Sequence, residues 1–194
     1  ELFQTVWENR EEFAKNQPEY FMEILFECAL GLDDIDSEIR QELVNLVIFY
    51  LNPETDINIL NAALILSVSI LSFSEEPNEE MLSRIYQIIE SSLSLEDDNL
   101  FKTVMHFIYV FITQLKYESF NLLNNYSEEL TQAIVLTVTQ VDIWQTLFAG
   151  AAIVKYWKCT QILEIVYRRL ISRIKVEVDF DDDDDEVRFE QDEI

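Results

Sequence analysis

The single histidine of this chain, His106, is the first side chain to consider for catalysis, because histidine is the commonest general acid or base in enzymes. It lies among apolar residues in the segment TVMHFIYVF, and this setting predicts an imidazole that is in the core or half-buried. One histidine disfavours a catalytic triad and a histidine-based proton-transfer pair. Two glycines in the whole chain cannot supply a phosphate-binding loop. We therefore expect a protein that is not an enzyme.

The two cysteines, Cys28 and Cys159, lie far apart in apolar stretches and lack the close spacing of a zinc site. Two buried thiols suit a reducing compartment, and a single disulfide between them stays open at this point. The acidic segment DDIDSEI, residues 33–39, is similar to a calcium loop but lacks the glycine and the terminal glutamate of an EF-hand. Weak divalent binding by the aspartate run near the C-terminal end would be incidental. Neither a metal site nor a cofactor is expected.

The elements that must position any site are predicted to be helices, because apolar residues recur at three and four residues along nearly the whole chain. The scarcity of glycine and proline agrees with short connections between helices. Asp36 or Ser37 is expected to cap one of these helices. The apolar run at 57–73 is short for a membrane span and carries asparagines and serines, so we expect a buried helix there. The expected helices cover about 2–15, 18–31, 37–52, 55–73, 78–93, 97–117, 127–140, 142–158 and 160–175.

These helices are expected to form pairs. First helices begin near residues 37, 78 and 127, and second helices begin near 55, 97 and 142, so the second helices are spaced by about 42 and 45 residues. Helix pairs at this period are typical of HEAT and armadillo repeats, in which each pair covers the apolar face of the next. The predicted fold is all-α, with antiparallel pairs stacked as an α-solenoid over residues 1–175. A nonrepetitive helical bundle is the alternative.

Charge is arranged in blocks along the chain, whose formal net charge is −25. Residues 1–154 carry 26 acidic and 6 basic side chains, residues 155–175 carry one acidic and six basic side chains, and residues 176–194 carry eleven acidic side chains and one basic side chain. This balance disfavours nucleic acid and anionic membranes as direct partners, and it favours basic proteins or basic signal segments. Solubility of an apolar-rich chain is the simpler explanation of the charge.

Residues 176–194 are expected to form a disordered or extended acidic segment, because adjacent carboxylates repel one another. It would serve as a solvated linker, as an arm that grips basic partners, or as an arm that shields the chain from them. Its anchors would be Phe180 and Phe189. The residues expected to bind a partner are Asp179, Asp181, Asp182, Asp183, Asp184, Asp185 and Glu186. The candidate basic patch onto which the acids would fold back consists of Arg168, Arg169, Arg173 and Lys175.

The chain resembles the importin-β, or karyopherin-β, superfamily of nuclear transport receptors. The resemblance rests on the helix-pair period over about residues 20–175, on the aspartate-rich segment at 179–186 and on TVWENREEF. In that last segment Trp7, Glu8, Glu12 and Phe13 are similar to a Trp-acidic-aromatic segment of these receptors, although the usual proline is missing and the segment is one residue shorter.

The resemblance implies a non-enzymatic interaction module, part of a receptor that shuttles between cytoplasm and nucleus. Its acidic inner surface would bind basic cargo or a small GTPase of the Ran type, and this binding would be steered by charge and weakened by salt. The alternative is a HEAT-type scaffold subunit of an enzyme or chromosome complex. Trp144, Tyr156 and Trp157 are aromatic residues that would line a groove if they do not belong to the core.

Overall fold

A computed structural model of the chain describes residues 2–29, 36–73, 78–94, 98–126, 128–140 and 143–181. Within these ranges the chain is helical and contains no strand, which confirms the all-α prediction. At the N-terminal end, the single helix expected over 2–15 is two short helices, α1 (Leu2–Glu8) and α2 (Arg10–Asn16), which are separated at Asn9. The helix α3 (Pro18–Ala29) follows.

The remaining helices follow the expected order with one addition. The first two predicted pairs are α4 (Ser37–Tyr50) with α5 (Ile57–Phe73) and α6 (Glu79–Ser94) with α7 (Asp98–Leu115). An unpredicted helix, α8 (Tyr117–Tyr126), precedes the third pair, α9 (Glu128–Gln140) with α10 (Trp144–Ala152). The chain continues through a π-helical turn, η1 (Ile153–Trp157), and a 3-10 turn, η2 (Thr160–Ile162), into α11 (Leu163–Asp181).

Acidic and amide side chains set several helix starts. Oδ1 of Asp36 accepts the backbone N–H of Glu38 at 2.8 Å, so the expected cap of α4 is confirmed. Oδ1 of Asp56 accepts from Asn58 at 3.0 Å at the start of α5. Oδ1 of Asn78 accepts from Met81 at 2.9 Å at the start of α6. These short polar side chains satisfy backbone donors that have no partner inside the helix.

Two boundaries differ from the sequence prediction. Lys116 has a left-handed φ of 52° and separates α7 from α8, so the helix expected over 97–117 ends at Leu115. A left-handed residue that is not glycine carries no clear sequence signal, which explains why α8 is missed. At the other end, α11 runs to Asp181 instead of ending near residue 175. The first residues assigned to the acidic segment therefore belong to this helix.

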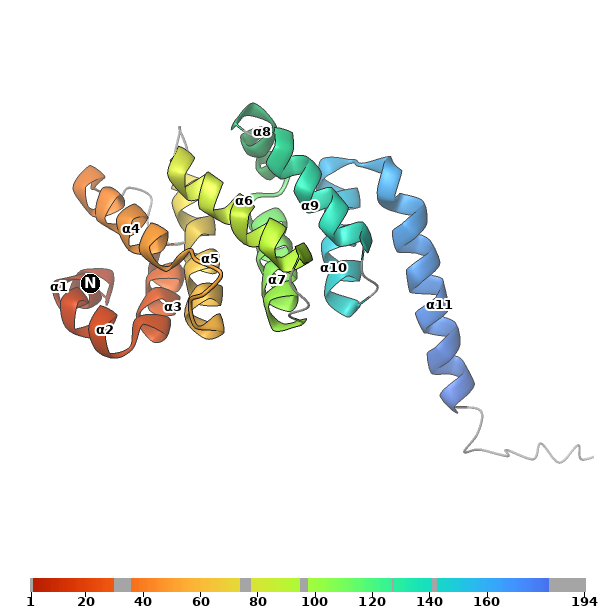
Figure 1. The fold of residues 1–194 in the computed structure, drawn as a ribbon, viewed down its shortest axis with the longest axis horizontal. Coiled ribbons are helices and arrows are strands. Elements are labelled where there is room, and N and C mark those ends of the chain that lie inside the picture. Colours follow the sequence, from red (N-terminus) through yellow and green to blue (C-terminus); the bar gives the residue numbers. More distant parts are fainter. Residues whose placement is uncertain are drawn as a thin grey trace, which may run out of the picture.

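The helices from α3 to α10, apart from α8, lie in two rows (Figure 1). We call α4, α6 and α9 the first-helix row, in which each helix contacts the next, and we call α5, α7 and α10 the second-helix row, which α3 precedes. Contacts between the rows join α4 to α5, α6 to α7 and α9 to α10. The helix α8 packs against α7, α9 and η1. The helix α11 packs on α10, at the end of the molecule opposite α1 (Figure 1).

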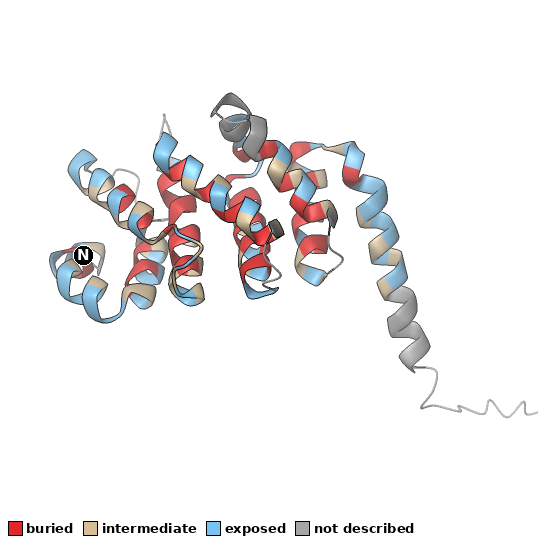
Figure 2. Ribbon diagram, viewed as in Figure 1, coloured by how far each residue is buried: buried red, intermediate tan, exposed pale blue. Residues whose placement is uncertain are grey.

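The hydrophobic core runs between the two rows (Figure 2). The helix α5 is buried along most of its length because it contacts α3, α4 and α7, so it needs apolar residues on several sides. Its buried Ser67 donates to the carbonyl oxygen of Leu64 at 2.6 Å, which satisfies the hydroxyl within the helix. Among the described residues no helix is both long enough and apolar enough to cross a membrane.

Gly150 lets three helices approach closely at the C-terminal end. A Cβ atom placed on Gly150 of α10 would lie 2.7 Å from Cγ2 of Val166 on α11 and 3.2 Å from Cγ1 of Val138 on α9. Both distances are shorter than ordinary van der Waals contact. The glycine is therefore a packing requirement for the contact of α10 with α9 and α11.

Candidate functional site

His106 lies on α7 with its side chain partly exposed and its ring partly buried, so the core setting is not observed and the half-buried alternative is nearer to the structure. Its Nδ1 atom lies 3.1 Å from Oδ1 of Asn61 on α5. Partial burial of the ring lowers the pKa of His106 below its usual 6.5. An amide cannot relay a proton as a carboxylate can, so this contact joins two helices and does not form a catalytic pair.

The two cysteines are free thiols, each half-buried, on separate parts of the fold. The sequence left open whether Cys28 and Cys159 form a disulfide, and in the structure they do not. Within the described ranges no three histidine, cysteine or carboxylate side chains gather closely enough to hold a metal ion. These two observations leave shape, charge and aromatic surface as the features with which the described residues could bind a partner.

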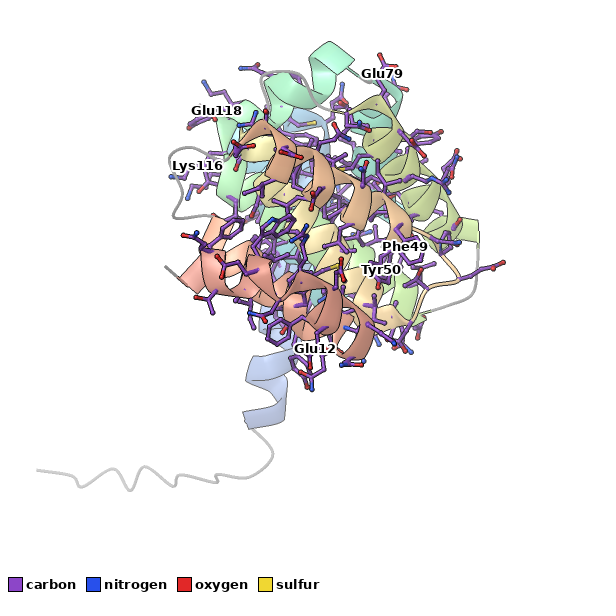
Figure 3. All side chains as sticks on the ribbon, turned by 90° about the vertical axis from the view of Figure 1, so that its left-hand side faces the viewer. Glu12, Phe49, Tyr50, Glu79, Lys116 and Glu118 are labelled. Atoms are coloured by element: carbon purple, nitrogen blue, oxygen red, sulfur yellow. The ribbon has the colours of Figure 1, made fainter. Side chains whose placement is uncertain are left out.

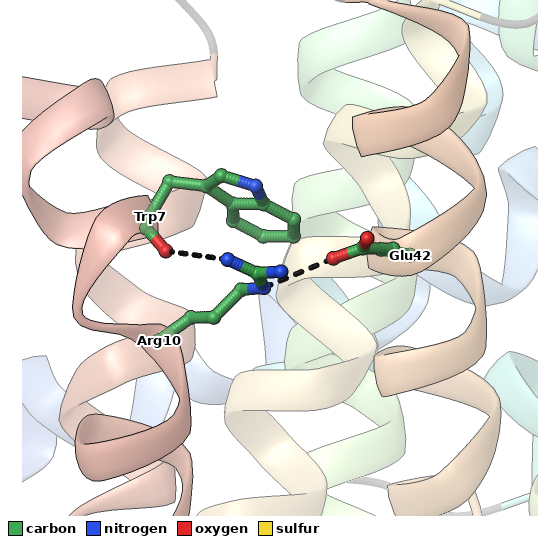
Figure 4. Close-up of polar contacts among 3 residues, drawn as sticks. All are labelled: Trp7, Arg10 and Glu42. Atoms are coloured by element: carbon green, nitrogen blue, oxygen red, sulfur yellow. Dashed lines mark hydrogen bonds and ion pairs between the residues drawn. The ribbon is translucent and has the colours of Figure 1, made fainter.

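The Trp-acidic-aromatic segment at the N-terminal end forms a cluster between α1, α2 and α4 (Figure 4). The indole of Trp7 is buried, and the guanidinium of Arg10 lies over it at 5.1 Å from the ring centroid. Nε of Arg10 lies 3.0 Å from Oε2 of Glu42, and its Nη1 donates to the carbonyl oxygen of Trp7 at 3.2 Å. Glu12 is exposed and Phe13 stacks on Phe21, so this segment mainly attaches α1 and α2 to the rest of the fold.

Phe49 of α4, labelled in Figure 3, is 75% exposed. Two shallow grooves meet at this residue. The groove between α2 and α4 has a volume of about 380 Å³ and includes Glu11 and the ion pair of Arg10 with Glu42. The groove between α4 and α6 has a volume of about 460 Å³ and includes Glu80 and Arg84, which form an ion pair at 3.7 Å. Asn45 and Phe49 line both grooves, which are therefore continuous. We call this surface the Phe49 face.

A third and larger groove, of about 860 Å³, lies between α6, α8 and α9 and the turn that follows η1. Its described lining is mostly apolar or hydroxyl-bearing and includes Leu136 and Cys159. Glu90 and Lys158 are the charged groups in that lining. This composition suits packing of apolar side chains better than chemistry on a small molecule.

The two rows differ in charge. The first-helix row exposes Glu38 on α4 and Glu79, Glu80 and Glu90 on α6. In the second-helix row, by contrast, α5 contains no charged residue, α7 contains Asp98 and Lys102, and α10 contains none. If the second-helix row forms the inner surface, that surface is not the acidic one that the family resemblance implies, because the carboxylates of the pairs lie on the other row.

Three of the four residues in the candidate basic patch are described, and each has a partner within the fold. Arg169 donates from Nη1 to the carbonyl oxygen of Val138 at 3.0 Å and from Nη2 to that of Thr139 at 2.7 Å, at the end of α9. Arg173 lies over the ring of Trp144 at 4.7 Å from its centroid. These arginines attach α11 to α9 and α10.

Arg168 differs from its two neighbours because it is exposed and pairs with Glu164 one turn earlier, with 2.5 Å between Nη2 and Oε1. The side chain of Lys175, the fourth residue of the patch, lies outside the described ones. The predicted acidic site also falls largely outside them. The backbone of Asp179, Phe180 and Asp181 is helical. The described ranges do not cover Asp182, Asp183, Asp184, Asp185, Glu186 and Phe189.

Of the aromatic residues that the sequence offered for a groove, Trp144 is exposed and Trp157 lines the largest described groove, whereas the exposed rings of Tyr109, Tyr117 and Phe148 were missed. Trp157 is buried, and its Nε1 donates to Oγ of Ser119 at 2.7 Å, so it belongs to the core. Trp144 is 41% exposed and stacks on Phe148 of the same helix, with ring centroids 6.0 Å apart. The spacing of 144 and 148 is a signal for one helix face. Comparison of the chain with family models, curated proteins and solved structures found no match.

Proposed function

We propose that this chain is part of a HEAT-like α-solenoid that binds basic protein segments through the Phe49 face. The observation that carries the proposal is the continuous pair of grooves between α2, α4 and α6, where the exposed ring of Phe49 lies among three carboxylates and two arginines. Arg10 pairs with Glu42 and Arg84 pairs with Glu80, so a basic partner would compete with these arginines for the two carboxylates, while Glu11 adds a third. The ring would pack on the aliphatic stem of a lysine or arginine, and the carboxylates would pair with its charged head.

The arrangement of the helices supports the solenoid part of the proposal. Each helix of a row contacts the next helix of that row, and each first helix contacts its own second helix. A repeat array has this pattern because each pair buries the apolar face of its neighbour. The overall negative charge would attract basic partners and accelerate their association.

The biological role that fits this binding is nuclear transport of basic cargo, with the protein moving between cytoplasm and nucleus. A small GTPase of the Ran type would be the second partner. In this proposal the acidic segment beyond α11 captures basic surfaces together with the Phe49 face. These roles come from the resemblance to the importin-β superfamily and from charge.

The test is binding of a fluorescein-labelled lysine- and arginine-rich peptide to the full chain, followed by fluorescence anisotropy. We expect the variant Glu11→Gln/Glu80→Gln to lower the affinity about 3- to 10-fold at low salt. The matched control, Glu23→Gln/Glu27→Gln, changes the net charge equally on α3, outside the Phe49 face, and should leave the affinity within about twofold.

The salt dependence of the peptide affinity distinguishes electrostatic binding from nonspecific hydrophobic binding. Raising the salt concentration from about 50 to about 500 mM should weaken the peptide's binding strongly, because exposed charges are then screened. Binding that is unchanged at high salt, or an equal effect of the two glutamate pairs, would contradict the proposal. A GTP-loaded Ran-type GTPase that binds the chain supports transport, whereas stable co-purification with a phosphatase, a kinase or a chromosomal ATPase supports the scaffold alternative.

A further inference from the structure

The second-helix row carries a continuous series of aromatic and cationic contacts near its C-terminal end. Arg173 of α11 lies over Trp144 of α10, and Trp144 stacks on Phe148 one turn later. The ring of Phe148 lies 6.3 Å from that of Tyr109 on α7, measured between centroids. Trp144, Phe148 and Tyr109 are 41%, 55% and 41% exposed, so three neighbouring rings from two helices, α10 and α7, face solvent.

The series continues beyond α10, through residues of η1 and the start of α8. The ammonium group of Lys155 lies 4.8 Å from the ring centroid of Tyr156, whose ring meets that of Tyr117 edge-on at 5.8 Å. Lys158 in turn lies 5.7 Å from the ring centroid of Tyr117. The pKa of Lys155 is raised chiefly by its hydrogen bond with Tyr156, and Tyr117 and Tyr109 add to this effect. Lys155 follows Phe148 by seven residues, about two turns further along α10 and η1.

We define the cation–aromatic strip by its central residues, Tyr109, Tyr117, Trp144, Phe148, Lys155 and Tyr156. The π-helical turn η1 helps to form it, because its extra residue per turn leaves Lys155 exposed and Tyr156 half-buried while Trp157 is buried.

The charge around the strip differs from that of the rest of the molecule. In a chain of net charge −25, neither α10 nor η1 contains an acidic residue, and α7 contains none after Asp98, although Glu118 of α8 is exposed next to Tyr117. The strip itself carries Lys155 and is bounded by Arg173 and Lys158. A basic partner would be repelled there, so the strip is a different surface from the Phe49 face.

We propose that the cation–aromatic strip binds an acidic peptide segment of a partner protein in which carboxylates alternate with aromatic or aliphatic side chains. The exposed rings would receive the apolar side chains, since exposed aromatic groups are the usual anchors of protein interfaces. The cations between the rings would pair with the carboxylates. Exposed aromatic residues with nearby cations are also used to bind single-stranded nucleic acid. The carboxylates on the other helices repel both kinds of partner, but they repel a nucleic acid more strongly, because it carries one phosphate per nucleotide whereas the acidic residues of the peptide alternate with uncharged ones.

The probe is a fluorescein-labelled synthetic peptide in which aspartate alternates with phenylalanine and leucine, added to the full chain. Two control peptides carry asparagine for aspartate, or serine for the apolar residues. We expect the acidic apolar peptide to bind more tightly than either control by about tenfold or more. Because Trp144 is exposed whereas Trp7 and Trp157 are buried, binding should also shift the tryptophan emission to shorter wavelength, and Trp144→Phe should abolish that shift.

Matched variants locate the binding site. Phe148→Ala should lower the affinity about 5-fold or more, whereas Phe49→Ala, a change at an exposed ring of the first-helix row, should leave it within about twofold. Lys155→Glu should weaken binding in a salt-dependent way, and the control Lys15→Glu on α2 should not. Circular dichroism of each variant shows whether it is folded, and Phe148→Tyr should retain binding.

Three outcomes would overturn the proposal. The first is that Phe148→Ala and Phe49→Ala bind the acidic peptide with equal affinity. The second is that the original chain binds the asparagine control peptide as tightly as the acidic peptide. The third is tighter binding of an oligo-dT strand that depends on the same residues, which would assign the strip to nucleic acid. Phe148→Ala should leave the affinity for the basic peptide, which tests the Phe49 face, unchanged. The two proposals can therefore be refuted independently.

Discussion

Replacement of Arg169 by methionine tests whether this arginine holds the end of α9 against α11. Its guanidinium donates to the carbonyl oxygens of Val138 and Thr139, at 3.0 and 2.7 Å. These carbonyls are among the last four of α9 and have no partner within that helix. A hydrogen bond from a charged donor contributes about 1.5–3 kcal/mol. Because Arg169 is half-buried and water can replace part of each bond, we expect Arg169→Met to lower the unfolding free energy by about 1.5–2.5 kcal/mol.

The neighbouring arginine provides a matched control. Arg168 pairs with Glu164 within α11, and the two side chains are 77% and 72% exposed. Exposed pairs of this spacing contribute about 0.3–0.5 kcal/mol. Arg168→Met changes the net charge by the same amount as Arg169→Met but should cost less than about 0.5 kcal/mol.

The assay is urea unfolding of both variants and the original chain, followed by circular dichroism. A loss for Arg169→Met that exceeds the loss for Arg168→Met by about 1 kcal/mol or more agrees with the structure. Equal losses would show that net charge and not the bonds to α9 is responsible, and no loss for Arg169→Met would refute the capping argument itself.

Three further predictions concern packing, a buried hydrogen bond and pH. Gly150→Ala should lower the unfolding free energy by about 1–3 kcal/mol, because its Cβ would lie 2.7 Å from Cγ2 of Val166, and the added substitution Val166→Ala should recover part of the loss in urea unfolding. Ser119→Ala should cost about 1–3 kcal/mol by leaving Nε1 of Trp157 without its acceptor; in the Trp157→Phe background the same change should cost clearly less. Burial lowers the pKa of His106 below 6.5, so the unfolded chain binds the proton more readily, and acidification through this range removes stability. Relative to the original chain, His106→Gln should therefore gain stability between about pH 7.5 and pH 5 in unfolding experiments, and a constant difference would contradict the assignment.

The helix boundaries illustrate which local features the sequence reveals. The start of α4 was predicted from Asp36 or Ser37, because a short polar side chain before an apolar helical pattern satisfies the first backbone donors, and the structure has Asp36 in that role. The start of α8 was missed, because the break at Lys116 depends on a left-handed backbone conformation that lysine rarely adopts. The end of α11 was placed too early, since the change from apolar to acidic residues was taken as the end of the helix.

The candidate surfaces needed the tertiary structure for a different reason. Trp144 and Trp157 both lie on apolar helical stretches, and the sequence does not distinguish them. The π-helical turn and the position of α8 bury Trp157 against Ser119, whereas Trp144 stays exposed beside Phe148. Which side of a helix is covered depends on its neighbours, and those neighbours are far away in the sequence.

By itself, the sequence determined that the described chain is helical, because the spacing of apolar residues and the scarcity of glycine and proline are local properties. It also determined the blocks of charge, which follow from composition alone. Only the tertiary structure decided that Arg169 and Arg173 contact α9 and Trp144, and that exposed rings of α7 and α10 meet. These contacts join residues about thirty or more positions apart, and packing between helices brings them together.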